Sequence, residues 1–513
     1  MMQAKSTNFK LLLAGVSLFV TLICWSLSAP LNSHQDERYH IGSVWCAKNN
    51  DELCKRLGTN KFNNEIAIIK ADLCVPPNIE ETYKRILIQQ SENSCRYEFS
   101  LNDSLDGFDA NPNSYFEMDG SIGVWIYPGH TPSFYFKFMN QFVSENAAGS
   151  VVVMRIINAL IFCVLLITVL IIANNKVFTS ALIAISLTII PHGLFLIAGI
   201  NTSGWAYTGS ALNWPFLFIL LNSRSRNHFK TFIALLGWIT TITLVLTSRF
   251  DAIVYVFFSN VLLIGLKIFG SKIFSRLLIT ISSVTTLVIF LILRTQISEL
   301  HGLFAPTTSH SNQISDLIVV FGNAIKIAVA TPLRLLGLQP PGWLFDSVPK
   351  LVLLIGLLLA FVVISQIFEA TNIAQRKFLF LGLGFYFFIL LSQTYVRRDW
   401  TTPFYLVRTS WTGDNFHPRY FLPIFPFIIG MTAVLSQQTQ TLFVQPRFKN
   451  LMITFLTLSH TLTLYKIGSI FRENPSWYWR NFPLGIEAIF VIGSLTFYFF
   501  LYLVFYTSKQ VET

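Results

Sequence analysis

Long apolar runs alternate with short polar segments along most of this chain. The first run covers about residues 11–29, and later runs are centred near positions 162, 188, 214, 240, 258, 285, 358, 386, 428, 461 and 494. Each has roughly the 17–25 residues that a helix needs to cross about 30 Å of hydrocarbon. Backbone polar groups find no water there, so the runs are predicted to be helices. The pattern predicts an all-α polytopic membrane protein with about twelve transmembrane helices.

One polar segment is much longer than the others and follows the first run. We therefore expect three parts: a transmembrane helix at 1–29, a large extracytoplasmic loop at 30–149, and a multi-helix transmembrane domain at 150–513. The first run also has the basic start and apolar stretch of a signal peptide. A retained membrane anchor is favoured, because an acidic motif follows it almost at once.

Basic residues indicate which side of the membrane each loop faces. Lys5 and Lys10 precede the first run, which places the amino terminus in the cytoplasm. Alternating the runs from there puts both termini inside and makes Ser248–Asp251 a tight external turn. The loops predicted to be cytoplasmic then contain Lys176, Arg224, Arg226, Lys230, Lys267, Lys272, Arg276, Arg376, Lys377, Arg447 and Lys449.

The overall composition agrees with this interpretation. Hydrophobic residues make up 53% of the chain and charged residues only 12%, whereas soluble domains carry about 25% charge. The formal net charge is +11, but the basic residues lie mostly in short loops between apolar runs. No Gly-rich phosphate loop accompanies them, so we expect membrane lipids and no nucleic acid as partners.

Cysteines are concentrated in the predicted extracytoplasmic loop. An even number of cysteines in an oxidising compartment favours disulfides over free thiols. The sequence allows three pairings and does not choose among them, and the spacing lacks the close Cys-x-x-Cys pair of a zinc site. The disulfide candidates are Cys46, Cys54, Cys74 and Cys95, whereas Cys24 and Cys163 lie in apolar runs and are predicted to be packing residues.

The first candidate for chemistry directly follows the first helix. Asp36 and Glu37 are adjacent carboxylates, and His40 lies one helical turn beyond Asp36. Carboxylates at this position can act as a general base or bind a divalent cation such as Mg²⁺ or Mn²⁺. The alternative explanation is a solvated helix start, where acidic residues are favourable.

Other external stretches also contain polar residues at membrane depth. His192 follows Pro191, and Asn201 lies in the next external turn, so a cavity-lining site and a packed kink both fit. Arg419 and Tyr420 begin a late helix, and Arg408 lies just before them. The planar guanidinium group of arginine binds phosphate through paired hydrogen bonds. The alternative is that these arginine side chains extend toward the lipid headgroups. The other ionisable side chains within the apolar runs are chiefly His460 and Lys466.

These stretches, in this order, resemble the bacterial membrane family called domain of unknown function 2142. The family's Asp-Glu-x-x-His motif is similar to Asp36-Glu37-Arg38-Tyr39-His40, although the usual proline directly before it is missing. Further matches are Tyr127-Pro128 with Phe134-Tyr135, Arg155 with Asn158, Pro191 with Asn201, Gly342-Trp343-Leu344 with Asp346 and Pro349, and Pro418-Arg419-Tyr420-Phe421-Leu422-Pro423. In the last match Pro418 replaces the family's usual glycine.

The layout further resembles the C-type fold of membrane glycosyltransferases, which take sugar from a polyprenyl-phosphate carrier on the outer face. This resemblance implies an enzyme of the bacterial inner membrane that adds sugar to O-antigen or another envelope polysaccharide or glycolipid. Asp36 or Glu37 would be the catalytic base. The substrate-binding residues would be His40, His192, Asn201, Arg408, Arg419 and Tyr420. The enzyme hypothesis gains if Asp36 and Arg419 line one external cavity, and it fails if they face opposite sides of the bundle.

Three other functions compete with this hypothesis. A flippase or transporter of lipid-linked sugars fits a chain of about twelve helices, but we find no internal repeat. A polysaccharide polymerase or ligase would share the lipid substrate, but such enzymes tend to have their large loop late in the chain. A zinc peptidase would need the first histidine of His-Glu-x-x-His, which Asp36 replaces here.

Overall fold

The computed structural model describes much of the chain. The described residues are 2–28, 37–47, 133–144, 146–222, 228–270, 350–369, 421–435, 445–473 and 485–507, together with strand segments between 54 and 126 and short pieces between 282 and 388.

Most of the described residues belong to helices that fall on the apolar runs. These helices are α1 (Met2–Ser28), α4 (Ala147–Ile172), α5 (Asn175–Thr188), α7 (Thr202–Asn222), α8 (His228–Leu246), α9 (Phe250–Gly270), α12 (Lys350–Glu369), α14 (Phe425–Leu435), α16 (Pro446–Glu473) and α18 (Gly485–Tyr506).

Length and apolarity identify candidate membrane spans among these helices. Within the described residues, the spans are Ser6–Ser28, Gly149–Ile172, His228–Leu246 and Gly485–Tyr506, and a bent pair of helices makes up to five. A mostly helical, multi-pass membrane protein is therefore confirmed. The number twelve is not reached in the described part of the chain and stays a prediction.

Asparagine side chains fix where several of these helices begin. Asn146 accepts a hydrogen bond from the amide of Gly149 at the start of α4. Asn174 does the same for Val177 at the start of α5. Such N-caps satisfy backbone donors that have no partner within the helix. Between them they set α4 and α5 as two separate helices joined by a very short turn.

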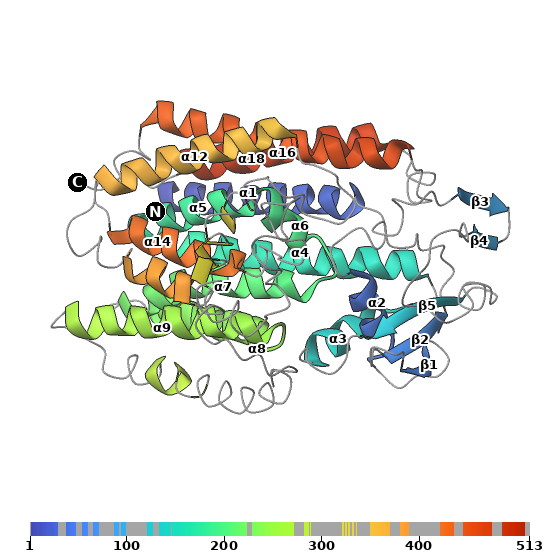
Figure 1. Cartoon of the computed structure of the whole chain (residues 1–513). Coiled ribbons are helices and arrows are strands. Elements are labelled where there is room, and N and C mark those ends of the chain that lie inside the picture. The colour runs from blue at the N-terminus through green and yellow to red at the C-terminus, as the bar shows by residue number, and fades with distance from the viewer. Residues whose placement is uncertain are drawn as a thin grey trace.

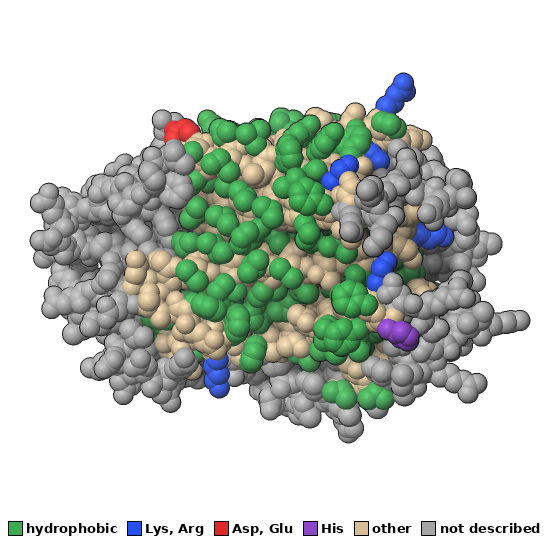
Figure 2. Space-filling model, turned by 180° about the vertical axis from the view of Figure 1, so that it is seen from behind, with side chains coloured by type: hydrophobic (Ala, Val, Ile, Leu, Met, Phe, Trp, Pro, Cys, Tyr) green, Lys and Arg blue, Asp and Glu red, His purple; other side chains and the backbone are tan. Residues whose placement is uncertain are grey.

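The two ends of the bundle differ in their residues. Both termini lie at one end, and helix α2 (Glu37–Trp45), helix α3 (Ser133–Met139) and the strands lie at the other (Figure 1). Figure 2 shows an apolar surface across the middle, with most of the coloured Lys and Arg side chains toward the end that carries the termini. This distribution is typical of a membrane protein whose termini face the cytoplasm. We call the end that carries α2 the "outer end", after the topology predicted from the sequence.

The predicted loop contains β-structure in addition to helices. Strands β1 (Cys54–Thr59), β2 (Glu65–Lys70) and β5 (Ser121–Ile126) form an antiparallel sheet in that order, and β3 (Leu87–Ser91) pairs with β4 (Ser94–Glu98). In the first sheet Glu65 pairs with Thr59 on one side and Ile126 on the other. Helix α2 packs against β5, so the sheet is connected to the bundle at the outer end.

Helix α5 ends in a sharp bend at the outer end. A π-helical turn, η3 (Ile189–Gly193), and the short helix α6 (Leu194–Ile197) follow it, and the segment Pro191–Ile197 lies at 85° to α5. Pro191 has no amide hydrogen to donate, which breaks the helical hydrogen-bond pattern. The chain then turns through residues 198–201 and descends again as α7.

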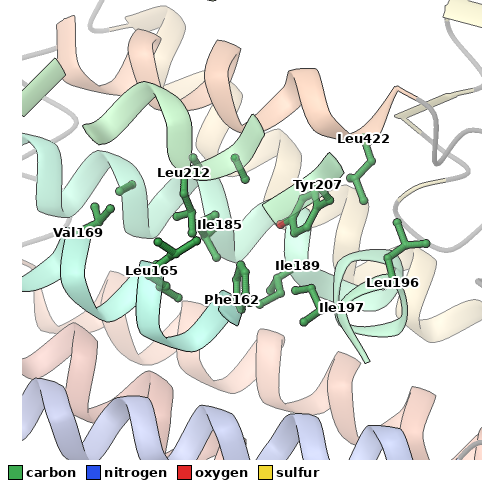
Figure 3. Close-up of a cluster of buried hydrophobic side chains, with 14 of the residues drawn as sticks. Phe162, Leu165, Val169, Ile185, Ile189, Leu196, Ile197, Tyr207, Leu212 and Leu422 are labelled. Atoms are coloured by element: carbon green, nitrogen blue, oxygen red, sulfur yellow. The ribbon is translucent and has the colours of Figure 1, made fainter. Parts of the chain in front are cut away.

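The core lies between helices that are distant in sequence. Figure 3 shows Phe162, Leu165 and Val169 of α4 gathered with buried side chains of α5, α6 and α7. Helix α1 packs along both α4 and α18. Trp25 of α1 donates to His460 Nε2 over 2.9 Å, and the His460 ring stacks on Phe497 of α18 at a centroid distance of 4.4 Å. Cys24 and Cys163 are buried and free, as predicted.

Candidate functional site

Glu37, the second acid of the first motif, lies buried at the start of α2. Its side chain is 0% exposed and forms an ion pair with Arg155 of α4, whose side chain is also 0% exposed. Arg155 Nε lies 3.0 Å from Oε1 and Arg155 Nη2 lies 2.6 Å from Oε2. The backbone amide of Ile200 also donates to Oε1 over 3.2 Å. Both carboxylate oxygens are therefore occupied.

Arg155 also connects the ion pair to the first membrane helix. Its Nη1 donates to the carbonyl oxygen of Ser26 over 2.7 Å, close to the end of α1. One helical turn further along α4, Asn158 donates through Nδ2 to the carbonyl of Gly199 over 2.7 Å. We call Ser26, Glu37, Arg155 and Asn158 the outer latch, because they join α1, α2 and α4 to the turn at residues 198–201.

Aromatic side chains cover the outer latch. Trp205 donates through Nε1 to Asn158 Oδ1 over 2.8 Å, and its ring meets the buried Tyr135 ring edge-on at 4.9 Å between centroids. His40, also buried, stacks on Phe136 at 5.7 Å. Within the described residues the Tyr135 hydroxyl makes no hydrogen bond of good geometry, although Asn158 lies close enough for a weak one. Burial raises the pKa of the Tyr135 phenol, nearby Asn158 opposes that rise, and the Glu37 carboxylate adds to it.

The next turn of chain is held in the same way. Asn201 accepts a hydrogen bond from the amide of Ser203 over 2.7 Å and so begins α7. Ser203 Oγ in turn accepts from Arg249 Nη1 over 2.7 Å. Arg249 lies in the short connection between α8 and α9, which agrees with the predicted tight turn at Ser248–Asp251. A guanidinium group therefore lies at the outer start of α7.

His192 contacts another part of the chain. Its Nδ1 is 3.2 Å from the carbonyl oxygen of Leu335, and its side chain is buried in η3. This contact fits a packed kink, one of the two explanations given by the sequence, and the substrate-binding role of His192 stays a prediction.

The disulfide prediction can be followed at one cysteine. Cys46 directly follows α2 and forms a disulfide bond. Two residues earlier, the Val44 carbonyl accepts a hydrogen bond from Asn140 Nδ2 over 2.8 Å. Helix α2 is therefore held at both ends. Cys54 and Cys95 lie on β1 and β4, but their side chains and the whole of Cys74 are outside the described residues.

The family comparison matches most of this chain. A family model described as "Predicted membrane protein (DUF2142)" matches residues 18–428. The chain belongs to the DUF2142 family. No curated protein and no solved structure matches it, so family membership establishes a membrane protein and leaves the activity open.

Several predicted site residues of this DUF2142 protein cannot be placed. Asp36, Arg408, Arg419 and Tyr420 lie outside the described residues. Whether Asp36 and Arg419 line one cavity is therefore untested. Of the other predicted residues, Glu37 and His40 lie on α2 with the latch, and Asn201 caps α7 beside it.

Sequence reasoning overlooked the centre of this arrangement. Arg155 was matched to a family motif, but it was not counted among the ionisable residues in the apolar runs. An arginine in the first turns of an otherwise apolar span was itself a signal, because such a charge needs a partner when it is buried. The identity of that partner was not readable, since Glu37 is 118 residues away in the chain.

Proposed function

We propose that this DUF2142 protein is a membrane glycosyltransferase. It would move a sugar from a polyprenyl-phosphate carrier to an envelope polysaccharide such as O-antigen at the outer end of the bundle. The observation that carries the proposal is convergence: parts of the predicted external motifs that lie far apart in sequence meet there. Glu37, Asn201 and Arg249 come from three different external segments and are connected through the latch and Ser203.

The apolar side of the bundle and the charge at its outer end both fit a lipid-linked substrate. Helix α8 exposes Phe232, Leu236 and Ile239, and this apolar side would face acyl chains. Arg249 at the start of α7 adds positive charge to the amino-terminal end of a helix dipole, which favours an anion. A polyprenyl phosphate combines an apolar tail with an anionic head, so both features suit it.

The reaction would be a displacement at the anomeric carbon of the sugar. Asp36 would take the proton from the acceptor hydroxyl, and the resulting oxygen would form the new bond to that carbon. The bond from the carbon to the lipid phosphate would break, and its electron pair would leave with the phosphate. Arg249, with the predicted Arg408 and Arg419, would stabilise the negative charge on the departing phosphate.

Glu37 does not fit the predicted role of cation ligand. The guanidinium of Arg155 already neutralises its carboxylate at 2.6 Å, and a second cation there would meet repulsion. Within the described residues, no three His, Cys, Asp or Glu side chains form a metal-binding group. The proposed reaction therefore uses no divalent cation bound by Glu37.

Sugar transfer from a synthetic polyprenyl-phosphate sugar tests the proposal directly. Purified protein in liposomes should glycosylate an acceptor glycolipid, with the product measured by mass spectrometry. The double variant Asp36→Ala, Glu37→Ala should lose at least about 100-fold in rate, because a general base contributes about 10²–10⁴-fold. Full activity in that variant would refute the base assignment.

Polar residues inside the bundle favour a second candidate, a transporter of lipid-linked sugar. Asn213 of α7 donates to Asn260 of α9 over 2.7 Å, and both are 0% exposed. The bend after α5 also resembles the broken helices that line transport sites. Movement of the labelled lipid across the liposome membrane, without any covalent product, would support transport and contradict the transferase.

A further inference from the structure

The outer latch gives the two adjacent acids different roles. A general base needs a free lone pair toward the proton that it accepts. Glu37 accepts hydrogen bonds from Arg155 Nε, Arg155 Nη2 and the amide of Ile200. Its side chain is also 0% exposed, so a substrate hydroxyl does not reach the lone pair that remains on Oε2. Taking a proton there would break a bidentate, charge-assisted contact inside a fully buried site. Glu37 is therefore poorly suited to be a base.

The same contacts make Glu37 well suited to fix the conformation of the turn at residues 198–201. Three successive residues of one turn are bound by side chains from three helices. Ser26 Oγ of α1 donates to the Leu22 carbonyl over 2.9 Å and shares that hydrogen more weakly with the Ala198 carbonyl at 3.4 Å. Asn158 Nδ2 of α4 donates to the Gly199 carbonyl over 2.7 Å. Glu37 of α2 accepts from the amide of Ile200. The turn that precedes α7 is thus fixed residue by residue.

Stability alone does not explain why a buried ion pair of Glu37 and Arg155 is present. Desolvation of two buried charges offsets most of their attraction, so apolar residues of similar size often stabilise a fold as well. What a bidentate arginine–carboxylate pair supplies is a single geometry. Here that geometry connects the start of α2 to the turn whose next residues carry the Asn201 cap and the Arg249 contact.

We infer that Arg155, with Glu37 and Asn158, is a positioning residue: the outer latch holds α2 and the turn at 198–201 in the arrangement that the reaction needs. Glu37 acts through Arg155 and does not exchange protons with the substrate. This inference rests on the proposed transferase function, and it leaves the base role to Asp36 alone.

Kinetics of matched variants separate a positioning residue from a base. Glu37→Gln should lower kcat by up to about 100-fold, the effect of misplacing reacting groups by about 1 Å. Its kcat/KM should keep the acidic limb of the wild-type pH profile. Asp36→Asn should remove that limb. If Glu37→Gln removes the limb instead, Glu37 is the base and the inference is overturned.

The fork of Arg155 gives a second kinetic test. Arg155→Lys retains the charge, but a lysine cannot contact both Glu37 oxygens and the Ser26 carbonyl together. It should therefore resemble Arg155→Gln, and wild-type activity in Arg155→Lys would contradict the inference. Thr21→Val is the matched control, because Thr21 is buried in α1 and hydrogen-bonded to Thr496 but lies outside the latch. It should keep wild-type kcat.

Thiol labelling tests the latch independently of activity. Ile200 is 0% exposed, so Ile200→Cys should resist a membrane-impermeant maleimide in the otherwise wild-type chain. Adding Arg155→Gln should expose it and raise its labelling rate at least about 10-fold. The six cysteines already in the chain set the background, which is measured without the new cysteine. Unchanged protection in Arg155→Gln would overturn the latch, whereas absence of transfer with normal labelling would reject only the proposed function.

Discussion

At the scale of single residues, Arg155 determines how the outer end is organised. It uses Nε, Nη1 and Nη2 in three hydrogen bonds to two other segments. Leaving any of these donors unpaired inside the protein would be costly, more so for a charged group. A single guanidinium therefore specifies where the end of α1 and the start of α2 lie relative to α4.

At Tyr135 we expect that removing a buried polar group does not destabilise the protein. The buried hydroxyl of this tyrosine makes no hydrogen bond of good geometry in the described part of the chain and has only a weak contact with Asn158. A buried polar group without a partner costs about 1–3 kcal/mol. Tyr135→Phe should therefore unfold at an equal or higher temperature than wild type in detergent. A clearly lower unfolding temperature would show that the hydroxyl is paired.

The same substitution has a defined pH dependence. Burial raises the pKa of the native Tyr135 phenol, whereas an unfolded tyrosine ionises near pH 10. The difference in stability between wild type and Tyr135→Phe should stay constant below about pH 10. Above it, the unfolded state of wild type loses protons first, so wild type should lose stability relative to the variant.

Sequence reasoning reached some of these residues but not their contacts. Asp36-Glu37 was recognisable as an external acidic motif because it follows an apolar run. The burial of Glu37 was not, because it depends on Arg155 and on the amide of Ile200, which are distant in sequence. The same limit applies to Cys46, whose participation in a disulfide was predictable from its compartment while its pairing was not.

At the scale of elements, the close approach of α6 and α7 is the most demanding feature. A Cβ atom at Gly204 would lie only 2.5 Å from the carbonyl oxygen of Leu196. That oxygen belongs to the backbone and cannot rotate away. Gly204→Ala should therefore push α6 from α7 and destabilise the protein by about 1–3 kcal/mol, typical of overpacking.

Gly265 provides the control for this prediction. It lies inside α9, and a Cβ there would meet nothing within 4 Å. Gly265→Ala should be neutral or stabilise by up to about 1 kcal/mol, because alanine favours a helix. Thermal unfolding of both variants measures the contrast, and equal stability of Gly204→Ala and wild type would contradict the tight contact.

Element positions were more predictable than element shapes. Apolar run length located α4, α8 and α18, because crossing hydrocarbon requires a fixed helix length. The bend after α5 was indicated only by Pro191, and its 85° angle depends on packing that one residue does not reveal. The strands between residues 54 and 126 were not predicted, because polarity alone indicates a loop and not its secondary structure.

At the scale of the whole molecule, orientation is the property to test. Both termini lie at the end opposite α2 and the strands. Epitope tags at either terminus should therefore resist protease in right-side-out spheroplasts, and a tag inserted between β4 and β5 should be digested. Immunoblots report both results. Digestion of a terminal tag in intact spheroplasts would reverse the proposed orientation.

The packing of α1 against α18 constrains how the protein is made. Thr21 and Thr496 share a hydrogen bond across 475 residues of chain. At about 5–20 residues per second, a ribosome needs about 24–95 s to add that length. Until α18 has been added, the flank of α1 that carries Thr21 lacks the helix that covers it in the folded protein. Nascent chains that stop early keep this flank uncovered, which gives membrane quality control a physical mark of incomplete synthesis.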